Sequence, residues 1–111
     1  MKVHIIDLSG DAADTVVEEV GPFATIVDAN LFARRYVRDS VERCRAPGMD
    51  AKAVLDAWFA FGEDATVPQA GDQAWKSAAE LHDFAARRAK PLDRNWRALD
   101  PRLRDEPEDD A

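Results

Sequence analysis

The chain has 111 residues, of which 46% are hydrophobic and 33% charged, and its formal net charge is −7 at pH 7. A hydrophobic share of this size excludes a disordered chain, and the length fits one domain of about 50 to 200 residues. The negative charge disfavours direct binding to free nucleic acid or an anionic membrane. Because Cys44 is the single cysteine and no signal peptide or run of about 18 apolar residues occurs, we expect a cytoplasmic protein without a membrane partner.

The N-terminal segment predicts one strand followed by one helix. Apolar and β-branched residues dominate residues 3–8, and the serine and glycine that follow are typical of a turn. The expected partner of this strand is residues 25–27, residues 66–67, or the same strand of a second copy. Over residues 11–20, apolar residues recur at spacings of three and four, which predicts a helix that ends at a Gly-Pro pair.

Two further helices are predicted in the middle of the chain. Apolar residues form one helical face over residues 25–45, where Thr25 and Asp28 have the spacing of a capping box. The next helix is expected to begin at the N-cap Asp50 and to end at Gly62.

The rest of the chain is expected to add one more helix and a tail. Residues 62–71 predict a long loop and residues 72–90 a fourth helix, whose basic end suits the negative helix terminus. We therefore expect a mainly α fold: a small single-domain bundle of about four helices over residues 1–104, with a short N-terminal strand and at most a minor two-stranded sheet. Residues 105–111 are expected to form a flexible acidic tail.

The turn after the first predicted strand, Asp7 to Asp11, is a candidate phosphate site. A strand, a glycine turn and a helix N-terminus together can present backbone N–H groups to an anion. The segment holds one glycine and two acids, whereas Walker and dinucleotide loops need several spaced glycines. The alternative is a plain turn in which Ser9 or Asp11 is a helix N-cap.

The segment Phe23-Ala24-Thr25-Ile26-Val27-Asp28-Ala29-Asn30-Leu31 resembles the opening of PIN-domain ribonucleases. The resemblance covers nine residues and implies that residues 25–27 form a second parallel strand that delivers Asp28 to a magnesium site. Asp28 is the position that matches the family pattern. Since Mg²⁺ needs charged oxygens from more than one element, Asp7 and Asp64 would have to converge on it.

Other metal-ligating residues give no recognisable pattern. His4, His82 and Cys44, with acids such as Asp83, have none of the spacings CxxC, HxxxH or HExxH. We expect His82 at the margin of the core and Cys44 as a small buried hydrophobic residue. The sequence therefore predicts no cofactor, no metal ligand and no catalytic residue.

A basic strip is predicted on the longest helix. Arg34, Arg38 and Arg45 lie within about 40° of each other on a helical wheel, and two more arginines are close by in the sequence. This strip could dock phosphate, an acidic partner or the chain's own acidic tail. The alternative is a solvated face whose charges pair with Asp39 and Glu42.

One aromatic residue is flanked by arginines. Trp96 lies between Arg94 and Arg97, and Trp and Arg dominate the energetics of protein interfaces. These three residues are predicted to contact a partner. The alternative is that Trp96 clamps the C-terminal segment onto the core.

Since no catalytic constellation is recognisable, the leading hypothesis is a small non-enzymatic interaction module: an accessory subunit, regulator or inhibitor that binds another protein or a second copy of itself. A second hypothesis is an acidic mimic of nucleic acid that inhibits a nuclease or DNA-binding protein. Net charges of −2, −2 and −3 over residues 1–46, 47–90 and 91–111 speak against it, because the acidity is spread. The third is a small metal-dependent PIN-like nuclease.

Overall fold

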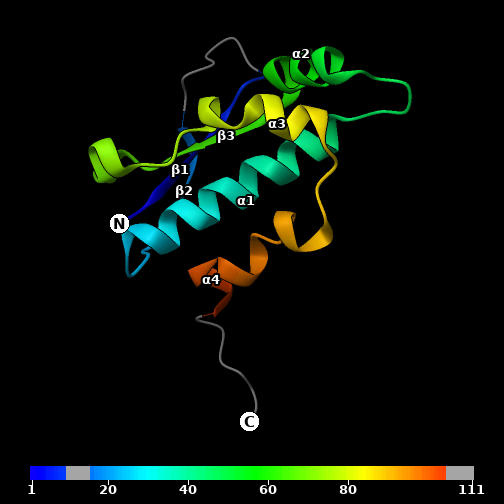
Figure 1. Cartoon of the computed structure of the whole chain (residues 1–111). Coiled ribbons are helices and arrows are strands. Elements are labelled where there is room, and N and C mark those ends of the chain that lie inside the picture. Colours follow the sequence, from blue (N-terminus) through cyan, green and yellow to red (C-terminus); the bar gives the residue numbers. More distant parts are fainter. Residues whose placement is uncertain (10–15, 105–111) are drawn as a thin grey trace.

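The computed structural model describes residues 1–9 and 16–104, which form a small α+β domain (Figure 1). Strands β1 (Val3–Asp7), β2 (Val16–Val20) and β3 (Glu63–Thr66) form an antiparallel sheet in the order β2-β1-β3. The expected mainly α bundle with at most a two-stranded sheet is therefore wrong. The predicted tail, residues 105–111, lies outside the described residues.

Strand β2 replaces part of a predicted helix. Val20 lies opposite Val3 and Glu19 lies opposite His4, and Val20 is fully buried. Branched Cβ atoms favour strands, so pairing with β1 prevails over the spacing that indicated a helix. The prediction is wrong for Val16–Val20, and residues 10–15 lie outside the described part of the chain.

Strand β3 lies where a long loop was expected. Thr66 pairs with His4, so one of the predicted partner segments does meet the first strand, although the strand itself covers Glu63–Thr66. Ala65 contributes a buried methyl group to the core face of this strand. Burial and pairing thus order a segment whose glycines and acids had indicated a loop.

The two central helices are confirmed. Helix α1 covers Ile26–Cys44, and the Thr25 side chain accepts a hydrogen bond from the Asp28 N–H at 3.0 Å. Helix α2 covers Ala51–Phe61, with Asp50 as its N-cap and Gly62 as its C-cap. A Cβ atom on Gly62 would lie 2.3 Å from Trp58 Cδ1, so a glycine is needed there.

The predicted fourth helix is broken into short pieces. In place of one helix over residues 72–90, the chain forms η1 (Pro68–Gln73), η2 (Ser77–Ala79) and α3 (Leu81–Ala86). The Asn30 side chain on α1 donates to the Gln73 carbonyl at 2.8 Å and accepts from the Trp75 N–H at 2.9 Å. These long-range hydrogen bonds hold the backbone in a non-helical path that the local periodicity does not reveal.

Short elements complete the chain after α3. They are η3 (Pro91–Arg94), η4 (Arg97–Leu99) and α4 (Pro101–Arg104). Figure 1 shows α1 running through the centre of the molecule. Helix α1 contacts β3, α2 and η3, and its buried side chains Phe32, Val37 and Val41 form the middle of the core. Within the described ranges, no helix has an apolar stretch long enough to cross a bilayer.

Ser40 connects three elements through one hydroxyl group. Its Oγ accepts from Trp58 Nε1 at 3.2 Å and from the Glu63 N–H at 2.9 Å, and the residue is buried.

Ser40→Ala would leave both donors without this acceptor, so we expect the free energy of unfolding to fall by about 2 kcal/mol. Urea denaturation measures this. The exposed Ser9→Ala is the control, with an expected change within about 0.5 kcal/mol, and equal losses in the two variants would contradict the prediction.

Candidate functional site

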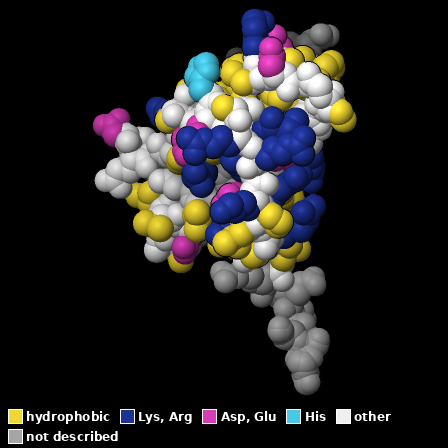
Figure 2. All heavy atoms as spheres, turned by 45° about the vertical axis from the view of Figure 1, so that its right-hand side comes forward, with side chains coloured by type: hydrophobic (Ala, Val, Ile, Leu, Met, Phe, Trp, Pro, Cys, Tyr) yellow, Lys and Arg dark blue, Asp and Glu magenta, His cyan; other side chains and the backbone are white. Residues whose placement is uncertain are grey.

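Positive charge is concentrated in two segments that meet in space. Residues 34–45 and 87–97 together hold ten of the fifteen Lys and Arg residues and three carboxylates, a charge of +7 for the two segments in a chain of net charge −7. Glu80 and Asp83, which pair with Arg34 and Arg87 from outside these segments, reduce the charge at this surface to +5. Arg35 NH1 donates to the Asn95 carbonyl at 3.2 Å, and α1 contacts η3. Figure 2 shows Lys and Arg side chains gathered across this side of the molecule. We call the surface formed by the two segments the basic face.

Asp39 fixes the second segment to α1. Its side chain is 8% exposed and accepts from Arg94 Nε at 2.7 Å and from Trp96 Nε1 at 3.1 Å. Arg43, one helical turn further along α1, lies 3.1 Å from the same carboxylate. One buried carboxylate therefore orients two cations and an indole of the basic face.

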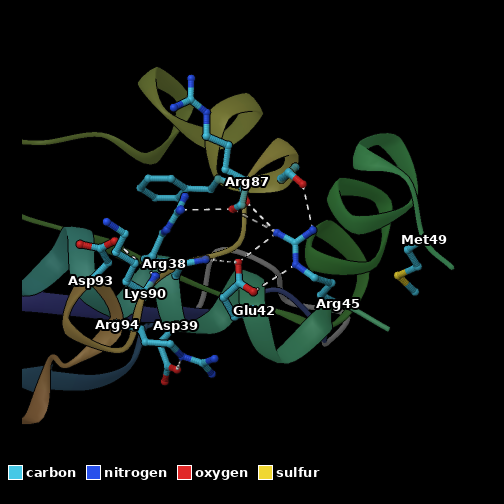
Figure 3. Close-up of polar contacts among 12 residues, drawn as sticks. Arg38, Asp39, Glu42, Arg45, Met49, Arg87, Lys90, Asp93 and Arg94 are labelled. Atoms are coloured by element: carbon cyan, nitrogen blue, oxygen red, sulfur yellow. Dashed lines mark hydrogen bonds and ion pairs between the residues drawn. The ribbon is translucent and has the colours of Figure 1, made fainter. Parts of the chain in front are cut away.

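Glu42 and Arg45 form a second buried contact (Figure 3). Arg45 donates two hydrogen bonds to the Glu42 carboxylate at 2.9 and 3.0 Å, and also donates to the carbonyls of Phe84 and Ala85. The same carboxylate accepts from the Ala89 N–H at 3.2 Å. Arg45 thus caps the C-terminal carbonyls of α3, where a cation is favoured by the helix dipole.

Arg34 and Arg38 are also turned toward the chain itself. Arg34 forms a bidentate pair with Glu80 at 2.7 and 2.8 Å, and this hydrogen bonding lowers the pKa of the Glu80 carboxyl. Arg38 is 7% exposed, lies over the Phe84 ring at 4.6 Å from its centroid and donates to the Arg87 carbonyl at 3.1 Å.

The predicted basic strip is therefore not one exposed row. Arg34 reaches Glu80, whereas Arg38 and Arg45 both donate to the Arg87 carbonyl, and all three side chains are half-buried or buried. Their binding role stays a prediction. The expectation that Glu42 would pair with a nearby arginine is met by Arg45.

Trp96 is held against α1. Its ring centroid lies 5.8 Å from that of Phe32 and 5.0 Å from that of Tyr36, and the Arg97 guanidinium lies over its outer side at 4.4 Å. This placement is that of a clamp for the C-terminal segment. Arg97 is exposed and Arg94 is partly exposed, and the predicted partner contact of these residues remains a prediction.

Two hollows lie in the basic face. The larger, of about 730 Å³, is lined by residues that include Arg43, Arg94, Arg97 and the exposed Leu92. The smaller, of about 250 Å³, lies between α1 and the segment that follows α3. The sequence places the cations of residues 87–90 at a predicted helix end and does not reveal that they lie beside α1, because that neighbourhood depends on the tertiary contacts of Asp39 and Glu42.

The acidic residues considered for a metal site do not meet. Asp28 is exposed in the first turn of α1, so the strand over residues 25–27 that the PIN resemblance implies is wrong. Asp7 accepts from the backbone and side chain of Ser9, and these hydrogen bonds lower the pKa of the Asp7 carboxyl. The rest of the candidate phosphate turn, Gly10 and Asp11, lies outside the described residues. Within residues 1–9 and 16–104, no three His, Cys, Asp or Glu side chains gather as metal ligands would.

The histidines and the cysteine are placed apart. His4 Nε2 lies 3.0 Å from Glu19 on the neighbouring strand, and His82 is exposed on α3. Cys44 is partly buried at the end of α1, where burial raises the pKa of its thiol above the ordinary value. A raised pKa disfavours the reactive thiolate.

Asp64 lines a third hollow, of about 630 Å³, between β3 and residues 71–78. Burial raises the pKa of the Asp64 carboxyl, and hydrogen bonds from the Ala65 N–H and the Ser77 side chain offset this only in part. The Ala65 N–H donates at 2.8 Å. The Asp64 carboxylate thus accepts the hydrogen bond of a backbone N–H group within the edge strand β3. Because this N–H group is already bonded, pairing of β3 with another strand is disfavoured.

Comparison with protein-family models, curated proteins and solved structures finds no match for this chain. The geometry of the basic face is therefore the ground on which a function can be assigned.

The buried pair on α1 predicts a difference between two carboxylate substitutions. Glu42→Gln removes the charge that compensates Arg45, whose side chain is 13% exposed, so we expect the free energy of unfolding to fall by about 3 kcal/mol. Asp56→Asn is the matched control, because it breaks the exposed pair with Lys52, and a loss below about 1 kcal/mol is expected. Urea denaturation at neutral pH compares them; similar losses would contradict the burial argument.

Asp64 predicts a pH dependence. A carboxyl with a raised pKa in the folded state lowers stability at pH values above its unfolded pKa, and this penalty vanishes at low pH, where both states are protonated. Asp64→Asn is therefore expected to be more stable than wild type at neutral pH, and the advantage should disappear as the pH falls toward about 4. Urea midpoints across this range test it. Asp72→Asn, at an exposed site of the same hollow, should show little change, and a pH-independent effect of Asp64→Asn would contradict the prediction.

Proposed function

We propose that this protein is a small non-enzymatic interaction module, an accessory subunit, regulator or inhibitor, that binds an acidic segment of another protein through its basic face. The observation that supports this is the charge of +7 over residues 34–45 and 87–97, or +5 with Glu80 and Asp83 included. The cytoplasm is the compartment we propose, because a chain with one cysteine suits reducing conditions.

Local charge governs such binding more than net charge does. At physiological ionic strength, charges separated by more than about 8 Å of solvent are largely screened. An acidic segment on the basic face therefore interacts mainly with the cations it touches. Buried contacts to Asp39 and Glu42 keep the backbone of residues 84–96 in place, so these cations are presented with little loss of conformational freedom.

The larger hollow adds an apolar contact to the charged ones. Leu92 is 65% exposed and lines this hollow together with Arg43, Arg94 and Arg97. Interfaces combine an apolar centre with surrounding arginines, and both are found here. The preferred partner segment is therefore acidic with at least one apolar side chain.

The other two hypotheses have less support. A nucleic-acid mimic needs carboxylates gathered on one face, whereas cations are what gather on the face that Figure 2 shows. A metal-dependent nuclease needs several carboxylates around one cation, and Asp28 lies in the first turn of α1, away from the strand that the hypothesis assumed.

The proposal predicts which cations matter for binding. A labelled Glu-rich peptide that contains leucine should bind the full chain, and Arg43→Gln, Arg88→Gln and Arg97→Gln combined should weaken binding about tenfold, or about 1.4 kcal/mol. The matched control combines Lys2→Gln, Lys52→Gln and Lys76→Gln, three exposed sites outside the basic face with the same loss of charge. For this control variant we expect the affinity for the peptide to change by less than about twofold. Fluorescence anisotropy at physiological salt measures both.

Three outcomes would overturn the proposal. Equal weakening in the two triple variants would show a general charge effect rather than a defined surface. Binding of a single-stranded oligonucleotide that matches or exceeds peptide binding would identify nucleic acid as the partner class. In light scattering, the molar mass could rise from that of a monomer to that of a dimer as the protein concentration increases. If it does so only when the basic face is intact, the partner is a second copy of the chain.

A further inference from the structure

The smaller hollow of the basic face has the composition of an oxyanion site. It has a volume of about 250 Å³ and is lined by five cations and two carboxylates: Arg34, Arg38, Arg87, Arg88, Lys90, Asp83 and Asp93. Arg88 and Lys90 are exposed at its rim, whereas Arg38 is 7% exposed. The hollow therefore combines one buried cation with exposed cations that a small ligand can contact.

Arg38 carries a buried charge that the described residues compensate only in part. Its NH2 group donates to the Arg87 carbonyl, a neutral acceptor, and its NH1 group is buried and has no hydrogen-bond acceptor within residues 1–9 and 16–104. The Phe84 ring supports the guanidinium at 4.6 Å from the ring centroid. A buried cation is costly unless an anion accompanies it.

The neighbouring carboxylates supply no hydrogen-bond acceptor to Arg38, although the charge of Arg38 contributes to the lowered pKa of the Glu80 carboxyl. Each accepts from a donor other than Arg38: Glu80 from Arg34 and Trp75, Asp83 from Arg87, Asp93 from the Lys90 N–H, and Glu42 from Arg45. Figure 3 shows Arg38 directed toward the Arg87 backbone carbonyl, which accepts its hydrogen bond. An anion from outside the chain could supply the hydrogen-bond acceptor that the NH1 group of Arg38 lacks among the described residues.

We propose that this hollow binds the phosphate group of a phosphorylated serine or threonine in the acidic partner segment, an inference that rests on the proposed function. A phosphate monoester carries nearly two negative charges and three acceptor oxygens, so it can accept from Arg38, Arg88 and Lys90 together. A carboxylate offers one charge and two oxygens. The phosphate therefore suits a site with several cations better than the side chain of Asp or Glu does.

The experiment compares two forms of one peptide. A labelled Glu-rich peptide with a single serine and the same peptide with phosphoserine are titrated with the full chain by fluorescence anisotropy. We expect the phosphopeptide to bind about tenfold more tightly, the effect of one or two additional charge-assisted hydrogen bonds. A third peptide with glutamate at that position should resemble the serine peptide, and inorganic phosphate should reduce the preference more than chloride at equal ionic strength.

The phosphate preference is then tested with two matched double variants. Arg88→Gln with Lys90→Gln should reduce the ratio of the two affinities to within about twofold of unity. Arg43→Gln with Arg97→Gln removes the same charge at the larger hollow and should weaken both peptides while the ratio remains. Both pairs involve exposed side chains, so folding is expected to be preserved.

The outcomes separate this inference from the proposed function. If the serine and phosphoserine peptides bind equally, or if Arg88→Gln with Lys90→Gln leaves the ratio unchanged, the phosphate site is overturned and binding of acidic segments to the basic face stands. If neither peptide binds, both proposals fail.

Discussion

The buried charges of α1 are the constraint on which the C-terminal third of the structure depends. Asp39 and Glu42 lie on the side of this helix that sheet and core leave open, and charges with little access to water need partners. Those partners are Arg94, Trp96 and the backbone of residues 84–89. Without residues 84–96, several buried charges would lose their partners at once. Because α3 and the short 3-10 turns have little helical stability of their own, these hydrogen bonds are what hold the segment in position.

Capping chemistry and apolar periodicity predicted the parts of the fold that are decided locally. Thr25 and Asp50 mark the starts of α1 and α2 through hydrogen bonds within four residues of the cap, which a sequence displays directly. Strand β2 and the segment around Trp75 were predicted wrongly for the opposite reason. Pairing of Val20 with Val3 and the hydrogen bonds of Asn30 connect residues far apart in sequence, and neither leaves a local signal.

The candidate site was likewise predictable from the sequence only in part. The excess of arginine on α1 is visible in the sequence, and so is the group of cations in residues 87–97. That the two form one surface depends on Asp39 reaching Arg94 across 55 positions, a contact no spacing rule predicts. The sequence also does not show which contacts each arginine makes. Arg45 caps α3 and Arg34 binds Glu80. Arg43 and Arg97 remain exposed at the surface.

The charge is unevenly distributed along the chain. The two segments of the basic face carry +7 in a chain of −7, and the other residues of 1–9 and 16–104 carry −7, so the net value describes neither group. At long range, an acidic partner is attracted by the cations of the basic face and repelled by the described carboxylates outside it, which favours one orientation of encounter. At contact, screening leaves only the nearest charges. Arg38 and Arg45 are cations that the fold has already largely removed from water, and Arg38 keeps a donor group without an acceptor among the described residues. In the phosphate site proposed above, an anion would therefore gain from a charge that is held in place before the anion arrives.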